Sequence, residues 1–335
     1  MRKPLLGVSK AAPFLLALVL VAGSLMDARR ASAATVDTRP TYAQLLAELV
    51  TSSAATTLPP EAKQMLTSVA SKYSGYYVGL KRSVTSGCNA TEAQVAIPAN
   101  SGTACLYGNP KGVKSLVLFG DSQANMWTPA LEALGLSFNM RIYAFSKSGC
   151  PPWEYTVTHP DGSAFPQCVS WRASVRAYIN TTHPNYVMVT GAAGFTSATH
   201  RVNSAEIASG IGRLTTALKP SRSHLILLSN IPWITASNKI TEPNTCLAAN
   251  LNAIKNCFAA RTGDALVNVI GTGIAQASTT YKIPLVDISS LFCTVSTCVT
   301  VVGKQLVYSD RYHALSSYIT YISRAMIPLL APKLI

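Results

Sequence analysis

The chain has 335 residues, of which 48% are hydrophobic and 13% are charged, and its formal net charge is +14. A chain this apolar can bury a sizeable core, so the composition excludes a disordered protein, and the length allows one large domain or two small ones. A basic protein could bind nucleic acid. No Lys/Arg cluster alternates with aromatic residues, however, so an anionic envelope or a glycan is the better-matched partner.

The first 34 residues read as a secretory signal peptide. A basic start, MRKPLLGVSK, precedes an apolar run at residues 11–26, and the sequence ASA at 31–33 offers small residues for cleavage. An uncleaved anchor is the alternative, because Arg29 and Arg30 separate the run from the cleavage site. The run has only 16 residues, fewer than the ~20 that span a bilayer. Cleavage after residue 34 would remove five basic residues and one acidic residue and leave a net charge of +10, so we expect a secreted or cell-envelope protein.

Two helix-like segments, TYAQLLAELV and PPEAKQMLTSVASKY, follow the signal and lie within residues 35–75. A loop-like region rich in small residues continues from there to residue 112. We therefore expect residues 35–109 to form a helical and loop extension in front of a domain at 110–335.

From residue 115 onward, short apolar runs alternate with longer amphipathic segments. The apolar runs are SLVLF (115–119), RIYAF (141–145), YVMVT (186–190), HLILLS (224–229) and IPLVD (283–287). The helix-like segments are 124–135, 169–181, 204–218, 247–275 and 315–330. Strands that are apolar throughout and alternate with helices predict a parallel sheet of about five strands with helices on both faces.

Ligands bind such sheets beyond the carboxyl ends of the strands. Three loops should meet at that rim: residues 120–122 (Gly-Asp-Ser) after the first strand, 146–149 (Ser-Lys-Ser-Gly) after the second, and 190–191 (Thr-Gly) after the third. Ser122 has two interpretations. Its hydroxyl could cap the next helix, or it could be a nucleophile, which needs a base oriented by an acid.

The segment VYSDRYHALSSY (307–318) supplies both a base and an acid, since Asp310 lies three residues before His313. At that spacing the carboxylate can accept the Nδ1–H of the imidazole, which leaves Nε2 to face Ser122. The chain has five histidines, and only His313 has an acid so placed just before a final helix. A solvated loop histidine is the alternative interpretation.

Eight cysteines all follow the predicted signal, at positions 88, 105, 150, 168, 246, 257, 293 and 298. Their spacing does not fit a zinc site, because there is no CxxC and no paired histidine nearby. Export permits disulfides, and we expect four structural bridges between sequence neighbours: Cys88–Cys105, Cys150–Cys168, Cys246–Cys257 and Cys293–Cys298. Sequence alone does not fix this connectivity.

Several motifs together resemble the SGNH/GDSL hydrolases, most closely the SGNH domains fused to bacterial membrane O-acyltransferases or found beside them. LFGDSQANMWTPAL (118–131) resembles the first block of the family, and KSGCPP (147–152) resembles the second. A CVSWR helix start (168–172), a paired-cysteine segment (292–298) and an ending YSDRYH (308–313) follow in the family's order. The similarity spans about 85–330 and implies a flavodoxin-like, three-layer α/β/α fold.

The resemblance also implies roles for individual residues. Ser122 would be the nucleophile, His313 the general base and Asp310 its orienting acid, while the backbone N–H groups of Ser122 and Gly149 would form the oxyanion hole. Two positions depart from the family. The third block usually offers an Asn for the oxyanion hole, whereas this chain has Thr-Gly-Ala-Ala at 190–193, and the residue after the serine is Gln123 where the subgroup usually has His.

From these observations we expect an exported serine esterase or O-acyltransferase that acts on acyl esters of envelope glycans, with acetyl as the expected acyl group, through an acyl-serine. No metal or organic cofactor is needed. Expected partners are an acylated saccharide and a membrane acyltransferase, without nucleic acid, and the chain should be a monomer. Two alternatives remain: a non-catalytic glycan-binding or scaffold protein on an SGNH shell, favoured by the missing Asn, and a lipid or thioester hydrolase.

Overall fold

The computed structural model describes residues 37–70, 80–192, 196–236, 239–240, 242–261 and 269–334. The chain divides into two units, Met1–Thr38 and Arg39–Ile335, and the fold is that of the second. The predicted signal peptide at residues 1–34 lies outside the described residues. Among the described residues, no helix combines the length and the apolar character that crossing a bilayer requires.

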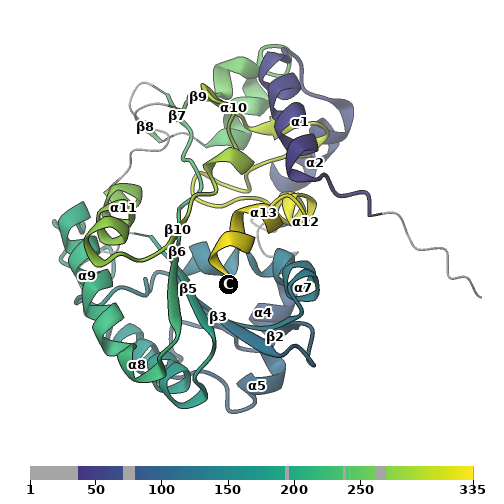
Figure 1. Ribbon diagram of the computed structural model, residues 1–335. Coiled ribbons are helices and arrows are strands. Elements are labelled where there is room, and N and C mark those ends of the chain that lie inside the picture. Colours follow the sequence, from purple (N-terminus) through teal and green to yellow (C-terminus); the bar gives the residue numbers. More distant parts are fainter. Residues whose placement is uncertain are drawn as a thin grey trace, which may run out of the picture. The chain divides into compact units, whose positions relative to one another are not determined.

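A mostly parallel sheet forms the centre of this unit (Figure 1). The strand order is β1-β4-β3-β5-β6-β10, and every neighbouring pair along this path is parallel. The strands are β1 (Asn89–Ala90), β3 (Lys114–Gly120), β4 (Met140–Lys147), β5 (Tyr186–Thr190), β6 (His224–Leu228) and β10 (Leu285–Val286). β2 (Leu106–Gly108) is antiparallel to β4. The order of the five predicted strands is that of a flavodoxin-like sheet, so the predicted fold class is confirmed.

Helices cover both faces of the sheet, as the apolar strands require. All of β5, and six of the seven residues of β3, are buried. Figure 1 shows α8 (Pro166–Thr182), α9 (Ser204–Ala217) and α11 (Val269–Tyr281) on one side of the strands. On the other side lie α7 (Thr128–Ser137), α12 (Ser316–Ile322) and α13 (Ile327–Leu330). α9 packs against α11, and α7 packs against α12.

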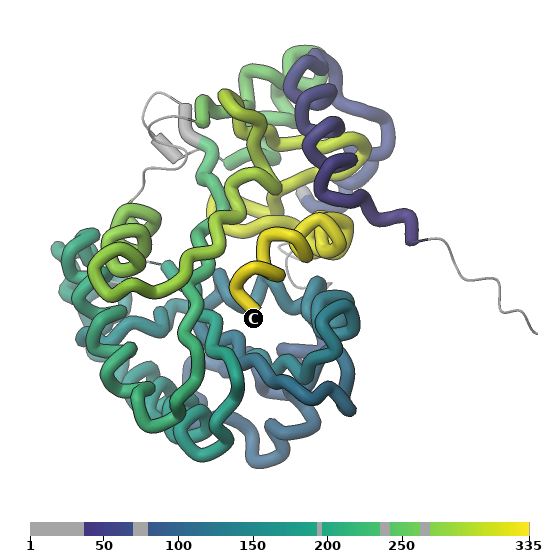
Figure 2. Tube along the Cα trace, viewed as in Figure 1, coloured from purple at the N-terminus to yellow at the C-terminus, as the bar shows by residue number. Residues whose placement is uncertain are grey.

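The N-terminal helices α1 (Tyr42–Ala54) and α2 (Pro60–Ala70) pack against segments from the C-terminal half of the chain, as the tube in Figure 2 shows. α1 contacts β12 (Val301–Val302), and α2 contacts β13 (Gln305–Leu306). The Gly303 N–H donates to Ser52 Oγ at 2.9 Å. The helices expected between residues 35 and 75 therefore pack against the body of the domain.

Two short strands come from residues before 110, where we expect only helix and loop. β1 and β2 have two and three residues, too few for a periodic pattern to reveal them. They share the outer edge of β4: β2 pairs with its first half, and β1 pairs with its end at Ser146 and Lys147. The sheet therefore has seven strands, five of which the sequence predicts.

The single helix predicted at 247–275 is wrong. The described residues there form α10 (Pro243–Ala249), η3 (Ile254–Cys257), β9 (Ala259–Ala260) and α11. The disulfide between Cys246 and Cys257 brings their Cα atoms to 5.7 Å, whereas a continuous helix would separate residues 11 positions apart by roughly 16 Å. Within the predicted span, α-helix is described only at the end of α10, residues 247–249, and in α11 from residue 269 onward.

The remaining described elements are short. They are α4 (Lys81–Thr85), α5 (Ser101–Ala104), α6 (Ser122–Asn125), η2 (Lys219–Ser221), η4 (Ser289–Leu291), η5 (Ala331–Lys333), β7 (Thr235–Ala236), β8 (Lys239–Ile240) and β11 (Thr297–Cys298). The four neighbouring-cysteine pairs are all bridged as predicted, and no cysteine is free.

Candidate active site

β3 ends in a turn that only glycine fits. A Cβ on Gly120 would lie 2.0 Å from the carbonyl oxygen of Thr190 on the neighbouring β5. Asp121 then caps α6, since its Oδ1 accepts the N–H of Gln123 at 2.8 Å. Ser122 is the first residue of α6. The capping role that the sequence allows for Ser122 thus belongs to Asp121.

Ser122, His313 and Asp310 lie in one hydrogen-bonded chain. His313 Nε2 is 2.9 Å from Ser122 Oγ, and His313 Nδ1 is 2.9 Å from both carboxylate oxygens of Asp310. If Nδ1–H donates to Asp310, Nε2 is left to accept the hydroxyl proton of Ser122. The structure brings together the three residues that the sequence singles out, although 191 positions separate Ser122 from His313.

The loop that carries Asp310 and His313 is held at both ends. Ser309 N–H donates to the His313 carbonyl at 2.9 Å, and Asp310 Oδ1 accepts the N–H groups of Tyr312 and His313 at 2.7 and 3.0 Å. Asn244 Nδ2 donates to the Ser309 carbonyl from outside the loop at 2.9 Å. The carboxylate is therefore fixed before any substrate binds.

The environment of Asp310 keeps its carboxyl ionised. Burial by itself would raise the pKa of Asp310, but the hydrogen bond and charge of His313, with the two backbone N–H groups, hold that pKa below its usual range. The Asp310 side chain is 34% exposed and the His313 side chain 16% exposed, so solvent reaches the pair without surrounding it.

Asp121 connects the loops after β3 and β5. Besides capping α6, its Oδ2 accepts the Ala192 N–H at 2.6 Å. The carbonyl of the same peptide unit, at Gly191, accepts from Asn230 Nδ2 at 3.1 Å. Burial raises the pKa of Asp121 to about 6, although the N–H groups of Ala192 and Gln123 and the charge of His313 act in the opposite direction. Spacing does not reveal this role, because it depends on the approach of β5.

Gln123 links α6 to the loop that carries His313. Its Nε2 donates to the Tyr312 carbonyl at 2.8 Å, and the side chain is buried. It therefore holds α6 against the residue that precedes His313. The sequence assigns no catalytic step to Gln123, and this contact is a positioning one.

Gly149 lies in a braced turn after β4. Its φ is +69°, a left-handed conformation that favours glycine, and the Cys150 N–H closes the turn on the Lys147 carbonyl at 3.0 Å. A Cβ on Gly149 would meet no atom within 4 Å, so the turn faces open space. The register pairs Gly120 with Ser146, which places Ser122 and Gly149 on loops that leave the same rim of the sheet.

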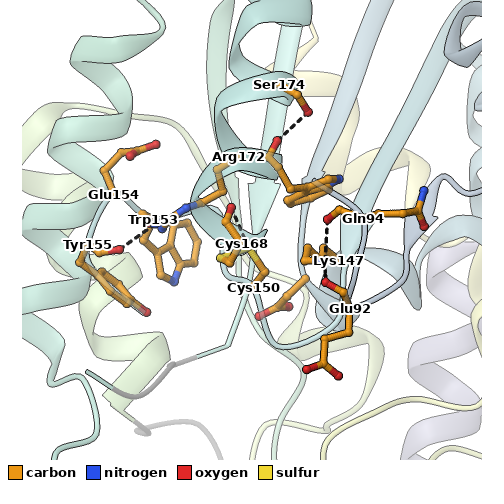
Figure 3. The surroundings of a disulfide bond; sticks show 12 residues. Glu92, Gln94, Lys147, Cys150, Trp153, Glu154, Tyr155, Cys168, Arg172 and Ser174 are labelled. Atoms are coloured by element: carbon orange, nitrogen blue, oxygen red, sulfur yellow. Dashed lines mark hydrogen bonds between the residues drawn. A yellow bond between two sulfur atoms is a disulfide. The ribbon is translucent and has the colours of Figure 1, made fainter. Parts of the chain in front are cut away.

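Figure 3 shows Lys147 and Cys150, which lie on either side of Gly149 in the sequence. Lys147 is fully buried, and its Nζ donates to the carbonyls of Thr91, Glu92 and Gln94 at 2.5, 2.7 and 2.9 Å. Three residues on, Cys150 is bridged to Cys168 of α8. The buried Lys147 ammonium, with its three acceptors, fixes the start of the turn. The Cys150–Cys168 disulfide fixes its end.

The third loop offers no Asn side chain among its described residues, Thr190 to Ala192. Ala193, the position aligned with the usual Asn, lies outside the described residues.

A family model described as an SGNH domain (fused to AT3 domains) matches residues 87–328. The chain belongs to this SGNH family. Among solved structures, the periplasmic domain of the lipopolysaccharide acetyltransferase of Salmonella ser. Paratyphi A is 16% identical, with a TM-score of 0.55 over 77% of this chain and 96% of that one. A putative acylhydrolase of Bacteroides fragilis is 15% identical, with a TM-score of 0.42 over 71% and 95% of the two chains. No curated protein matches the sequence.

As a member of this family, the protein is an SGNH-type enzyme, a hydrolase or acyltransferase. The resemblance that the sequence motifs carry is confirmed. The Ser122–His313–Asp310 chain lies within the matched residues, as does the Gly149 turn. Four disulfides in an SGNH domain are typical of an exported protein.

Proposed function

We propose that this SGNH protein is a serine esterase or O-acyltransferase that moves acetyl groups to or from the hydroxyls of an envelope glycan. The observation that carries the proposal is the hydrogen-bonded chain from Ser122 Oγ through His313 to Asp310. A nucleophile in contact with a base, and a base oriented by a carboxylate, are the parts that acyl transfer requires.

In the proposed mechanism Ser122 Oγ attacks the carbonyl carbon of the ester while His313 Nε2 takes the hydroxyl proton. Asp310 holds the imidazole in the required tautomer and stabilises the imidazolium. The oxyanion that forms is bound by the backbone N–H groups of Ser122 and Gly149. His313 then delivers its proton to the departing alcohol, which leaves an acyl-serine. Water completes a hydrolysis, and a sugar hydroxyl completes a transfer.

The proposal also names the acyl group and the molecule that accepts it. The family model is described as fused to AT3 domains, and a similar fold belongs to the periplasmic domain of a lipopolysaccharide acetyltransferase. These names support a membrane acyltransferase as the partner that supplies acetyl groups, and an envelope saccharide as the substrate. We further propose that residues 1–34 are cleaved on export, that 35–109 and 110–335 act as extension and SGNH domain, and that the mature protein is a monomer.

Labelling with a fluorophosphonate probe tests the nucleophile. The wild-type protein should take one label on Ser122, and Ser122→Ala should take none while it keeps its circular dichroism spectrum. Ser317→Ala, an equivalent change at an exposed position of α12, should label like wild type. Full labelling of Ser122→Ala would exclude the assignment.

The same reagents separate the alternatives. A folded wild-type protein that takes no label would favour the glycan-binding or scaffold interpretation, which the absence of Asn at 190–192 supports. If the protein labels, a comparison of acetyl with long-chain esters and thioesters decides between a glycan O-acetyl enzyme and a lipid or thioester hydrolase.

A further inference from the structure

Two cavities adjoin at the edge of the sheet where the strands begin. The first, of about 600 Å³, is lined by His183, Pro184, Asn185, Pro220, Ser221, Arg222 and His224. The second, of about 610 Å³, shares His224 and includes Tyr186, Ile226, Lys282, Ile283 and Lys333. Ser122 lies at the opposite edge of the sheet, just after the end of β3. Because β3 runs seven residues from Lys114 to Gly120, the cavities lie roughly 20 Å from the proposed active site.

The charged side chains that line the two cavities are all basic. Arg222, Lys282 and Lys333 line the cavities, and Lys114 Nζ reaches them through Tyr186, whose hydroxyl accepts its hydrogen bond at 3.3 Å. No carboxylate lines either cavity, and among the described residues no salt bridge involves any of these four side chains.

Helix ends do not account for so much positive charge. α8 ends at Thr182 and α11 ends at Tyr281, each one residue before a cavity residue. A helix C-terminus carries about half a negative charge, so the two together supply about one unit against four full positive charges. Roughly three positive charges remain for a ligand.

The backbone brings the basic groups to this edge at a cost. His183, Arg222 and Lys282 have φ values of 47°, 56° and 54°, the left-handed conformation that usually belongs to glycine after a helix. A non-glycine residue in this conformation is strained, because its Cβ lies close to the following carbonyl oxygen. Three of the four such residues in the described chain line these two cavities, and all three have a cationic or imidazole side chain.

The linings indicate what the ligand would be. The first cavity combines the Arg222 guanidinium, whose planar donors match phosphate oxygens, with two imidazoles and the polar Asn185 and Ser221. The second combines two lysines with apolar surface from Ile226 and Ile283. We propose that the paired cavities bind a phosphate ester, with the phosphate beside Arg222 and the body of the ligand, with a second negative group, between Lys282 and Lys333.

Calorimetric titration with fructose bisphosphate, a soluble probe with two phosphates, tests this site. The double variant Arg222→Glu/Lys282→Glu should lose about 100-fold or more in affinity, since it removes two charge-assisted contacts and reverses the charge at both positions. The control is Lys63→Glu/Lys255→Glu, which makes the same charge change at exposed positions outside the cavities and should bind like wild type. Circular dichroism verifies that each variant is folded.

Vesicles of phosphatidylglycerol and phosphatidylcholine provide the second arm, which tells a lipid headgroup from a soluble phosphate ester. Binding of either ligand that only Arg222→Glu/Lys282→Glu weakens would support the site. Equal losses in both double variants, or no binding of either ligand to the wild-type protein, would overturn it, because the attraction would then follow net charge alone. Labelling of Ser122 should not change in either variant, so this test is independent of the proposed catalysis.

Discussion

Asp121 has more contacts than its place in the Gly-Asp-Ser motif suggests. One carboxylate oxygen caps the helix that begins with Ser122, and the other holds the Ala192 N–H of the third loop. Burial raises its pKa to about 6. One buried side chain therefore couples the geometry of two loops to its own protonation.

This coupling predicts a pH dependence of stability. The folded side chain keeps its proton up to about pH 6, whereas the unfolded one releases it near pH 4, so the folded state binds more protons between these values. The free energy of unfolding should therefore fall by about 3 kcal/mol through this group as the pH rises from about 4 to about 6. Asp121→Asn removes the ionisation, so urea unfolding of this variant should lack that fall.

Asp161→Asn is the matched control in an exposed loop. The hydrogen bond from Ser163 lowers the pKa of Asp161, so its ionised form favours the folded state and its replacement acts in the opposite direction, mainly below pH 4. Parallel stability curves for wild type and Asp121→Asn between pH 4 and 6 would contradict the role given to Asp121.

At the scale of elements, the turn after β4 is clamped between α8 and the segment that follows β1. Lys147 fixes its start through three carbonyls, and the Cys150–Cys168 bridge fixes its end. In the proposed mechanism an oxyanion donor contributes through its position, and losing one donor costs about 10²–10³ in rate. In that mechanism the clamp acts on the reaction rate as well as on stability.

Removing two different disulfides separates the effect of the clamp on reaction rate from its effect on stability. Cys150→Ser/Cys168→Ser and Cys88→Ser/Cys105→Ser open loops of nearly equal length, 18 and 17 residues. Each should lower the free energy of unfolding by about 3 kcal/mol, because loop-closure entropy depends on length. Only the first pair should also slow fluorophosphonate labelling of Ser122, since only Cys150 adjoins Gly149. Urea unfolding and labelling rates measure the two effects, and equal slowing in both variants would show that the clamp acts through stability alone.

The sequence predicts the elements that show a regular pattern of apolar residues, together with the site residues that lie at a fixed spacing within a motif. Five apolar runs become β3, β4, β5, β6 and β10, and the Asp-x-x-His spacing places Asp310 against His313. The sequence does not predict the short strands β1 and β2, nor the break within 247–275. The contacts of Asp121 with Ala192 and of Gln123 with Tyr312 are not predicted either, for another reason. They join segments that only the folded sheet brings together, and no local pattern encodes them.

At the scale of the whole molecule, the proposed oxyanion hole has two backbone donors, and the described part of the third loop adds no Asn side chain. A third donor is typically worth about 2.7–4 kcal/mol in the transition state. Hydrolysis of p-nitrophenyl acetate should therefore be slow. Contacts with a larger saccharide can compensate by positioning the ester, so kcat/KM should be much higher on an acetylated glycan.

Steady-state kinetics on both substrates measure this preference, with Ser122→Ala as the blank for each. Ala193→Asn is the matching gain-of-function variant and should raise the rate on the small ester if its amide reaches the oxyanion. A wild-type rate on p-nitrophenyl acetate that equals a fast esterase would refute the two-donor arrangement.

The 191 positions between Ser122 and His313 also set an order in time. A ribosome adds roughly 5–20 residues per second, so Ser122 is made roughly 10 to 40 s before the histidine that would activate it. During that interval the proposed mechanism leaves Ser122 as an unactivated alcohol, however early β3 folds. In the proposed mechanism a chain cut anywhere between the two positions would be inert toward esters, because it would carry Ser122 without His313.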